Sequence, residues 1–176
     1  MGAMPRLLSE KLRYLRQQSG MTQGAVAQQL LLASYTHITK IEAGQRAASL
    51  TLIIRMAHLF GVPTDYLLRD TVPVTCVTVA STPRLHAQEQ PLPLHHFGST
   101  LRHLRVQYGM SQTDLARRLG LARQAYISNL EAGRKEPSPN IVVQVADIFG
   151  VTTDYLLRTP PDAANTPIEA TEQPDA

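Results

Sequence analysis

The 176-residue sequence predicts an all-α protein made of two copies of one small helical unit. The first observation is an internal repeat: residues 12–69 align with residues 101–158 without a gap, and about 27 of the 58 aligned positions are identical. The second is that apolar residues recur at helical spacing in each copy, between Ser, Thr, Gly and Pro residues typical of helix ends. Whatever this chain does, it should do twice.

The repeat also predicts the domain boundaries. We expect a first domain at 7–69, a linker with a short strand or an ordered connector at 70–95, a second domain at 96–158, and a Pro-rich acidic disordered tail at 159–176. In the linker, VPVTCVTVA alternates Thr with Val, as an exposed strand would, and the Pro-rich remainder is typical of a linker. A flexible connector of about 26 residues would span roughly 25–30 Å.

Each domain is expected to contain five short helices. In the first copy these fall at about 8–19, 23–30, 34–43, 49–60 and 64–68. The second helix should start at an N-cap, Thr22 in the first copy and Ser111 in the second, where Asp114 completes a capping box. Ser49 and Ser138-Pro139 begin the fourth helix.

Glycines should end the third helix. Gly44 and Gly133 occupy the position after it, where a left-handed residue is needed. Gly120 stands in the turn before the third helix of the second copy, and the first copy has Leu31 there. A positive φ angle would strain that leucine.

Charge is distributed unevenly along the chain. The net charge is +3, and the four acidic residues of the tail are accompanied by no Lys or Arg. Residues 1–158 therefore carry 17 basic and 10 acidic residues, or about +7, which suits a polyanionic partner.

Several classes of function and site are disfavoured. Phosphate-binding loops, nucleophile elbows and paired-carboxylate motifs are absent from the sequence, so we expect no enzyme and no cofactor. The histidines His86, His95, His96 and His103 lack a partner set at zinc-ligand spacing, so we expect no metal. Cys76 is the single cysteine and cannot form an internal disulfide, which fits a reducing cytosol, and no apolar run could span a membrane.

The pattern LRxLR…M[ST]Q…LA..LG…YIS.LEAG…FGV..DYLL resembles the helix-turn-helix domains of the Cro/C1 repressor type, also called the xenobiotic-response-element family. The resemblance covers both copies, about two thirds of the chain. It implies two tandem lambda-repressor-like domains of five helices each, joined by a linker. It also implies that Arg16 pairs with Glu42, and Arg105 with Glu131, as structural ion pairs between the first and third helices.

The same resemblance predicts the residues that meet double-stranded DNA. The third helix should enter the major groove, where base pairs present distinct donors and acceptors. Gln23 and Gln112, at the start of the second helix, should contact phosphate or a base, and the loop after the third helix should hold phosphates. The predicted contacts are Ser34, Tyr35, Thr36, Thr39, Lys40 and Arg46 in the first copy, and Arg123, Gln124, Ser128, Asn129, Arg134 and Lys135 in the second.

Two departures qualify that assignment. The helix-2 Ala and the helix-3 Ile are eleven positions apart in both copies, as in Ala27 and Ile38, whereas the common pattern has ten. The extra residue lies in the turn or in the first turn of the third helix. The second departure is Leu31, which stands where the second copy has Gly120, so the first copy is either the weaker DNA binder or a partner-binding copy. The faces of the two third helices also differ, so the copies should not read the same sequence.

The sequence therefore predicts a sequence-specific DNA-binding transcriptional regulator, which would be cytoplasmic and nucleoid-associated. A homodimer of the chain is possible, and the sequence does not decide it. The alternative is a protein-interaction module, antitoxin-like or an anti-repressor partner, in which one or both domains bind protein.

Overall fold

A computed structural model describes residues 7–75 and 94–158, with side chains described for 96–157 in the second stretch. These residues form helices and turns and no strand. The first repeat contains α1 (Leu8–Gln18), α2 (Gln23–Gln29), α3 (Thr36–Glu42), α4 (Leu50–Phe60) and α5 (Thr64–Leu68). The second contains α6 (Leu94–Gln107), α7 (Gln112–Arg118), α8 (Ala125–Glu131), α9 (Pro139–Phe149) and α10 (Thr153–Arg158). The predicted all-α fold class, with five short helices in each repeat, is confirmed.

The predicted caps start the helices. The Thr22 hydroxyl accepts a hydrogen bond from the Ala25 amide (3.1 Å). Ser111 accepts one from the Asp114 amide (3.1 Å), and the Asp114 carboxylate accepts one from the Ser111 amide (3.1 Å), which confirms the capping box. Ser49 and Ser138 cap α4 and α9 in the same way.

The third helix of each repeat is shorter than expected. α3 begins at Thr36 and α8 at Ala125, so the residues before them, including Tyr35 and Gln124, lie in the preceding turn. The extra residue of both repeats is therefore accommodated in that turn. In the first repeat the Ser34 hydroxyl accepts a hydrogen bond from the Thr36 amide (3.3 Å) and lies 2.7 Å from the Thr36 hydroxyl, which fixes the start of α3.

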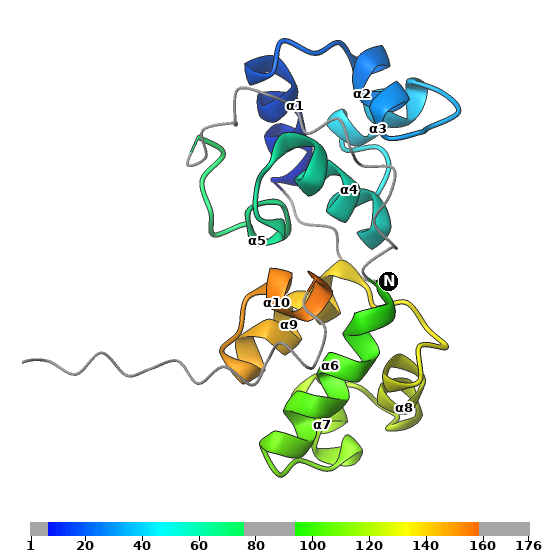
Figure 1. Ribbon diagram of the computed structural model, residues 1–176, viewed down its shortest axis with the longest axis vertical. Coiled ribbons are helices and arrows are strands. Elements are labelled where there is room, and N and C mark those ends of the chain that lie inside the picture. Colours follow the sequence, from blue (N-terminus) through cyan, green and yellow to red (C-terminus); the bar gives the residue numbers. More distant parts are fainter. Residues whose placement is uncertain (1–6, 76–93, 159–176) are drawn as a thin grey trace, which may run out of the picture.

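One apolar core runs through both repeats. Within each, the inward faces of the five helices are buried, as Leu12, Ile38 and Ile53 are in the first and Leu101 and Ile127 in the second. The buried residues of the two repeats form one continuous cluster, because α5 packs against α9 and α10. In Figure 1 the first repeat lies above the second, and α5 meets α9 and α10 where the two repeats are in contact. Burial of this apolar surface is the main stabilising contribution to both small domains.

The crossing of α6 and α8 is unusually close. A Cβ atom built on Gly98 would lie 2.5 Å from the Leu130 carbonyl oxygen and 2.8 Å from that of Glu131. The first repeat has Ser9 at this position, so α1 and α3 cannot approach one another as closely there. Gly98 was not singled out by the sequence, because a glycine within a helix has no signature that distinguishes a close crossing from a tolerated defect.

The described part of the connector is short. Val74 and Thr75 lie in a turn, and the Tyr66 hydroxyl donates a hydrogen bond to the Val74 carbonyl. The rest of the predicted strand, Cys76 and His86 lie outside the described residues, as does the tail from 159. None of the described helices combines the length and the apolar character needed to cross a membrane.

Candidate nucleic-acid interface

A buried ion pair joins the first and third helices of each repeat. Arg16 Nε lies 2.6 Å from Glu42 Oε1, and Arg105 Nε lies 2.6 Å from Glu131 Oε1. The hydrogen bond to the glutamate raises the pKa of each arginine above its ordinary value. Both glutamate side chains are almost fully buried, at 2% and 5% exposed, so loss of the arginine would leave an uncompensated charge. The two predicted structural pairs are confirmed.

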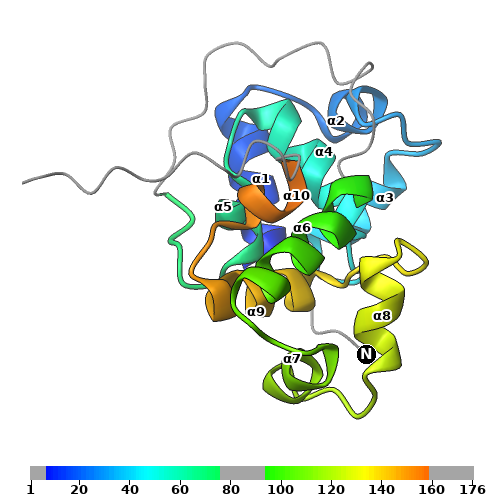
Figure 2. The same cartoon turned by 60° about the horizontal axis from the view of Figure 1, so that its bottom comes forward.

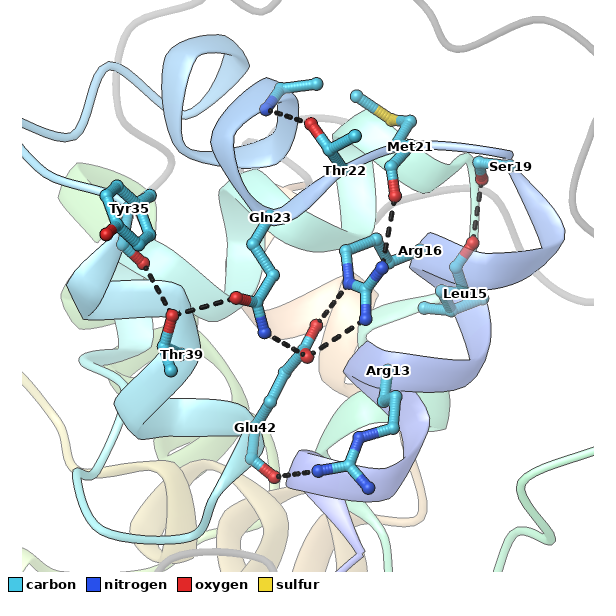
Figure 3. Close-up of polar contacts among 11 residues, drawn as sticks. Arg13, Leu15, Arg16, Ser19, Met21, Thr22, Gln23, Tyr35, Thr39 and Glu42 are labelled. Carbon is cyan, nitrogen blue, oxygen red and sulfur yellow. Dashed lines mark hydrogen bonds and ion pairs between the residues drawn. The ribbon is translucent and has the colours of Figure 1, made fainter.

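The glutamate also holds the glutamine at the start of the second helix. Gln23 Nε2 donates to Glu42 Oε2 (2.8 Å), and Gln112 Nε2 donates to Glu131 Oε2 (2.8 Å). Figure 3 shows the first of these networks, with Gln23 between Glu42 and Thr39. Both glutamines are half-buried. One N–H of each amide is thus used within the protein, and the contact of these glutamines with a phosphate or a base stays a prediction.

The networks differ in the residue that they bring to the surface. In the first repeat the Thr39 hydroxyl donates to Gln23 Oε1 (2.9 Å). In the second, Gln124 Nε2 donates to Gln112 Oε1 (2.7 Å). Arg105, Glu131, Gln112 and Gln124 thus form one chain of hydrogen bonds, which leads from the protein interior to an exposed amide just before α8.

The hydrogen-bonding capacity of each group determines the orientation of the Gln112 and Gln124 side-chain amides. A carboxylate only accepts hydrogen bonds, so the Gln112 nitrogen must face Glu131 and its oxygen must face Gln124. The Gln124 nitrogen must then donate to that oxygen, so Gln124 keeps its own oxygen and one N–H for an external partner. One acceptor beside one donor is the pattern that complements adenine in the major groove.

The other predicted contact residues lie around the third helices with unequal exposure. Tyr35 is 60% exposed at the position equivalent to Gln124. Ser128 and Asn129 are partly buried, and the remaining residues of the predicted third-helix faces are exposed, namely Ser34, Thr36, Thr39, Lys40 and Arg123. Ser34 and Thr39 are engaged in local hydrogen bonds within the repeat.

The loops after α3 and α8 turn back onto the helix that precedes them. The amides of Arg134 and Lys135 both donate to the Asn129 carbonyl (2.9 and 3.3 Å), and the Arg46 amide donates to the Lys40 carbonyl (3.2 Å). Their side chains are exposed at the carboxyl end of the helix, where cations are favoured. Lys135 Nζ also lies 4.5 Å from the centre of the Tyr126 ring and makes a cation–π contact with it within the repeat.

The turn before the third helix confirms the strain expected at Leu31. Leu31 has a φ of 54° and is 64% exposed, and Gly120 has a φ of 64° at the equivalent position. The two turns make the same backbone hydrogen bonds, with Leu32 donating to the Ala27 carbonyl and Leu121 to the Ala116 carbonyl (both 2.9 Å). The left-handed conformation is therefore required by the turn and is not a property of glycine alone.

Within the described ranges, no three His, Cys, Asp or Glu residues are grouped as metal ligands would be. The side chain of His95 lies outside the described residues.

Comparison with known proteins decides the family. A helix-turn-helix profile matches residues 12–67 and again residues 101–156, which together make up more than half of the chain. The chain belongs to the helix-turn-helix family. The Cro/C1-type resemblance of its sequence is thereby confirmed in both repeats.

Several curated proteins resemble one repeat-sized stretch of this helix-turn-helix chain. The SPbeta prophage-derived uncharacterized HTH-type transcriptional regulator YonR of Bacillus subtilis is 39% identical over 62 residues, or 35% of this chain and 56% of YonR. The uncharacterized HTH-type transcriptional regulator YqaE of the same organism is 34% identical over 62 residues, or 35% of this chain and 53% of YqaE. An uncharacterized HTH-type transcriptional regulator of Methanocaldococcus jannaschii is 37% identical over 51 residues, or 29% of this chain and 76% of that protein.

The match thus spans about half the length of the two Bacillus proteins. No solved structure matches the chain significantly.

Proposed function

We propose that this chain is a sequence-specific DNA-binding transcriptional regulator that places α3 and α8, with the turns before them, in the major groove of duplex DNA. Its membership of the helix-turn-helix family supports this, as do the relatives named as transcriptional regulators. The net positive charge of residues 1–158 would draw such a protein to the phosphate backbone.

The observation that carries the proposal is the braced amide of Gln124. An exposed glutamine normally loses side-chain entropy when it binds a base, which reduces the net gain in affinity. Gln124 is already held by Gln112 (2.7 Å), which is held by the buried Glu131 (2.8 Å). We therefore assign to Gln124 the recognition of adenine, with Arg123 next to it in the turn before α8 and Asn129 further along α8 as additional contacts.

The first repeat offers different chemistry. Tyr35 replaces Gln124, and Lys40 replaces Asn129, so this repeat supplies an aromatic ring and a cation in place of two amides. Arg46, Arg134 and Lys135 would hold phosphates, which position the protein without reading sequence.

One feature of the first repeat favours the alternative for that repeat alone. Leu31 and Tyr35 are both more than half exposed, and both lie in the turn that precedes α3. Exposed apolar side chains close together in sequence are typical of protein contacts as well as of contacts with thymine methyl groups. The second candidate function is therefore a first repeat that binds a partner protein, beside a second repeat that binds DNA.

The test is a selection of bound duplexes from a random pool, followed by titration of the selected duplex with variants of the full chain. We expect Gln124→Ala and Asn129→Ala to relax the sequence preference at single positions and to weaken binding by about 1–3 kcal/mol per lost base contact. Gln17→Ala, which removes an exposed amide from α1, is the control and should leave the affinity unchanged. Unaltered preference in both test variants would contradict the assignment.

Arg134→Ala tests the phosphate contacts separately. It should weaken binding to all duplexes similarly and reduce the slope of log K against log salt by about 1, because one phosphate contact is lost. Gln45 stands at the equivalent position of the first repeat, so Gln45→Ala is the matched control. If Tyr35→Ala leaves DNA affinity unchanged, the first repeat does not read DNA through that ring.

A further inference from the structure

The two repeats contact one another in a reciprocal pattern. The Thr64 amide donates to Asp154 Oδ2 and the Thr153 amide donates to Asp65 Oδ2, both at 2.8 Å, and the hydroxyls of Thr64 and Thr153 lie 2.7 Å apart. Thr153 and Asp154 are the residues equivalent to Thr64 and Asp65. A contact in which residue i meets j′ while j meets i′ is the signature of a twofold interface. Here it forms within one chain.

This contact completes the last helix of each repeat. Thr64 and Thr153 are the first residues of α5 and α10, and the first amides of a helix have no acceptor within it. The aspartate of the other repeat supplies that acceptor and places a negative charge at the positive end of the helix. Both threonines are fully buried. Each repeat therefore satisfies a buried amide of the other.

The contacts at the edge of the interface do not follow the reciprocal pattern, and they favour pairing of the two repeats within one chain. Arg69 Nη1 lies 2.6 Å from Asp147 Oδ1 on α9, and the Thr51 hydroxyl donates to Glu136 Oε1 (3.1 Å). The first repeat has His58 where the second has Asp147. Two copies of the first repeat placed in the same way would set Arg69 against a histidine instead of a carboxylate.

The interface leaves the third helices free on one side. In Figures 1 and 2, which differ by a rotation of 60°, α3 and α8 lie on the same side of the molecule, away from α5 and α10. Their surroundings differ in chemistry, with Tyr35 and Lys40 in one repeat and Gln124 and Asn129 in the other.

We propose that a single copy of this chain is a covalent pseudo-dimer that binds one DNA site made of two unlike half-sites at a fixed spacing. The inference rests on the proposed DNA-binding function. A symmetric helix-turn-helix dimer binds two equal half-sites about 34–36 Å apart, and its interface sets that spacing. This chain has a reciprocal contact between its repeats and unequal reading faces, so its site is bipartite without being a palindrome.

The interface is tested first without DNA, by amide hydrogen exchange of the full chain. We expect slow exchange at Thr64 and Thr153. Asp154→Ala, which removes the acceptor, should accelerate exchange at Thr64, and Asp65→Ala should accelerate exchange at Thr153, with the remaining core amides still protected. Glu10→Ala, which removes an exposed carboxylate from α1, is the control and should leave both amides protected. Fast exchange at both threonines in the unaltered chain would overturn the pseudo-dimer.

The site is tested next, with duplexes in which the two selected half-sites are moved apart or together by one to five base pairs. We expect a complex of one chain with one duplex, and a loss of at least about tenfold in affinity at five inserted base pairs, where the second half-site turns to the other face of the duplex. The double variant Asp65→Ala/Asp154→Ala, which lacks both acceptors, should respond less steeply to spacing. Sedimentation of the free chain should give the mass of a monomer.

Two results separate the failure of this inference from that of the proposed function. Selective binding with equal affinity at all spacings, or two chains on a palindrome, would overturn the pseudo-dimer site and leave the DNA-binding function intact. Failure to select any duplex from the random pool would overturn both, whatever the exchange of Thr64 and Thr153.

Discussion

The two repeats share a fold and differ where stability and recognition are adjusted. At four equivalent positions the first repeat has Ser9, Lys11, Ala25 and Leu31, and the second has Gly98, Thr100, Asp114 and Gly120. The second repeat uses glycine where helices cross and where the chain turns, and a capping box to begin α7. The first accommodates a leucine with positive φ and begins α2 with a simple cap. One fold therefore tolerates different local solutions.

Position 11 shows the largest chemical difference. Lys11 is fully buried, and its Nζ atom donates to the carbonyls of Tyr66 (2.7 Å) and Arg69 (2.6 Å) at the end of α5. Burial lowers the pKa of Lys11, and the charge of Asp70 opposes this shift. The second repeat buries Thr100 instead. The cation thus closes the end of α5 in the first repeat, where unpaired helical carbonyls favour positive charge.

The largest expected effect in this comparison is at the helix crossing. Gly98→Ala should lower the free energy of unfolding by about 3 kcal/mol, because the new Cβ atom would lie 2.5 Å from backbone and α6 must move away from α8. Urea unfolding of the full chain measures it. The helix propensity of alanine acts in the opposite direction by about 1 kcal/mol, so an unchanged or raised stability would show that the crossing is loose. Ser9→Ala is the control and should have little effect.

The turns are expected to differ by a smaller amount. Leu31→Gly should raise the free energy of unfolding by about 1 kcal/mol, because it relieves a left-handed leucine that is 64% exposed and has little burial to lose. Gly120→Leu should lower it by a similar amount. Thermal and urea unfolding of both variants give the comparison, with Leu31→Ala as the control that keeps the strain. Destabilisation by both Leu31→Gly and Gly120→Leu would mean that Leu31 contributes packing instead of strain.

The smallest expected difference between the repeats is in their stability at acidic pH, and it arises at the capping box of α7. Hydrogen bonds from Ser111, first from its side chain and then from its backbone, lower the pKa of Asp114. The carboxylate therefore stabilises the folded state above the unfolded pKa of about 3.9, and this contribution is lost as the pH falls through the lower folded pKa. Ala25, at the equivalent position, cannot titrate.

Amide exchange in α7 and α2, followed from pH 5 to pH 2, would show the difference. The α7 amides should lose protection at a higher pH than those of α2. In the Asp114→Asn variant this difference should disappear. Equal acid responses in the unaltered chain would show that the box contributes nothing measurable.

Much of the fold was predictable because its signals are local. Thr22, Ser111 and Gly133 act through their own backbone neighbours, so sequence patterns identified the helix ends to within one or two residues. The third helices were predicted to begin too early, because the residues that precede Thr36 and Ala125 form a tight turn with helix-like backbone angles. Such a turn has the same periodicity as a first helical turn.

The candidate site was only partly predictable. The positions of Gln124 and Asn129 follow from the repeat and the resemblance, and their DNA contacts stay a prediction. The role of Glu131 in holding Gln112 could not be foreseen, because it depends on the direction in which a glutamine side chain turns. The same sequence was equally compatible with a Gln112 amide nitrogen that points toward solvent.

The sequence by itself determined the duplication, the helical class, the caps and the family, because each of these depends on residues that act over a few positions or on the comparison of one copy with the other. Only the tertiary structure decided which elements of the two copies meet. The identical TDYLLR at 64–69 and 153–158 does not reveal that Thr64 binds Asp154 and Thr153 binds Asp65. That pairing joins residues about 90 positions apart, and it arises because two buried amides that lack partners in their own helices find carboxylates in the other repeat.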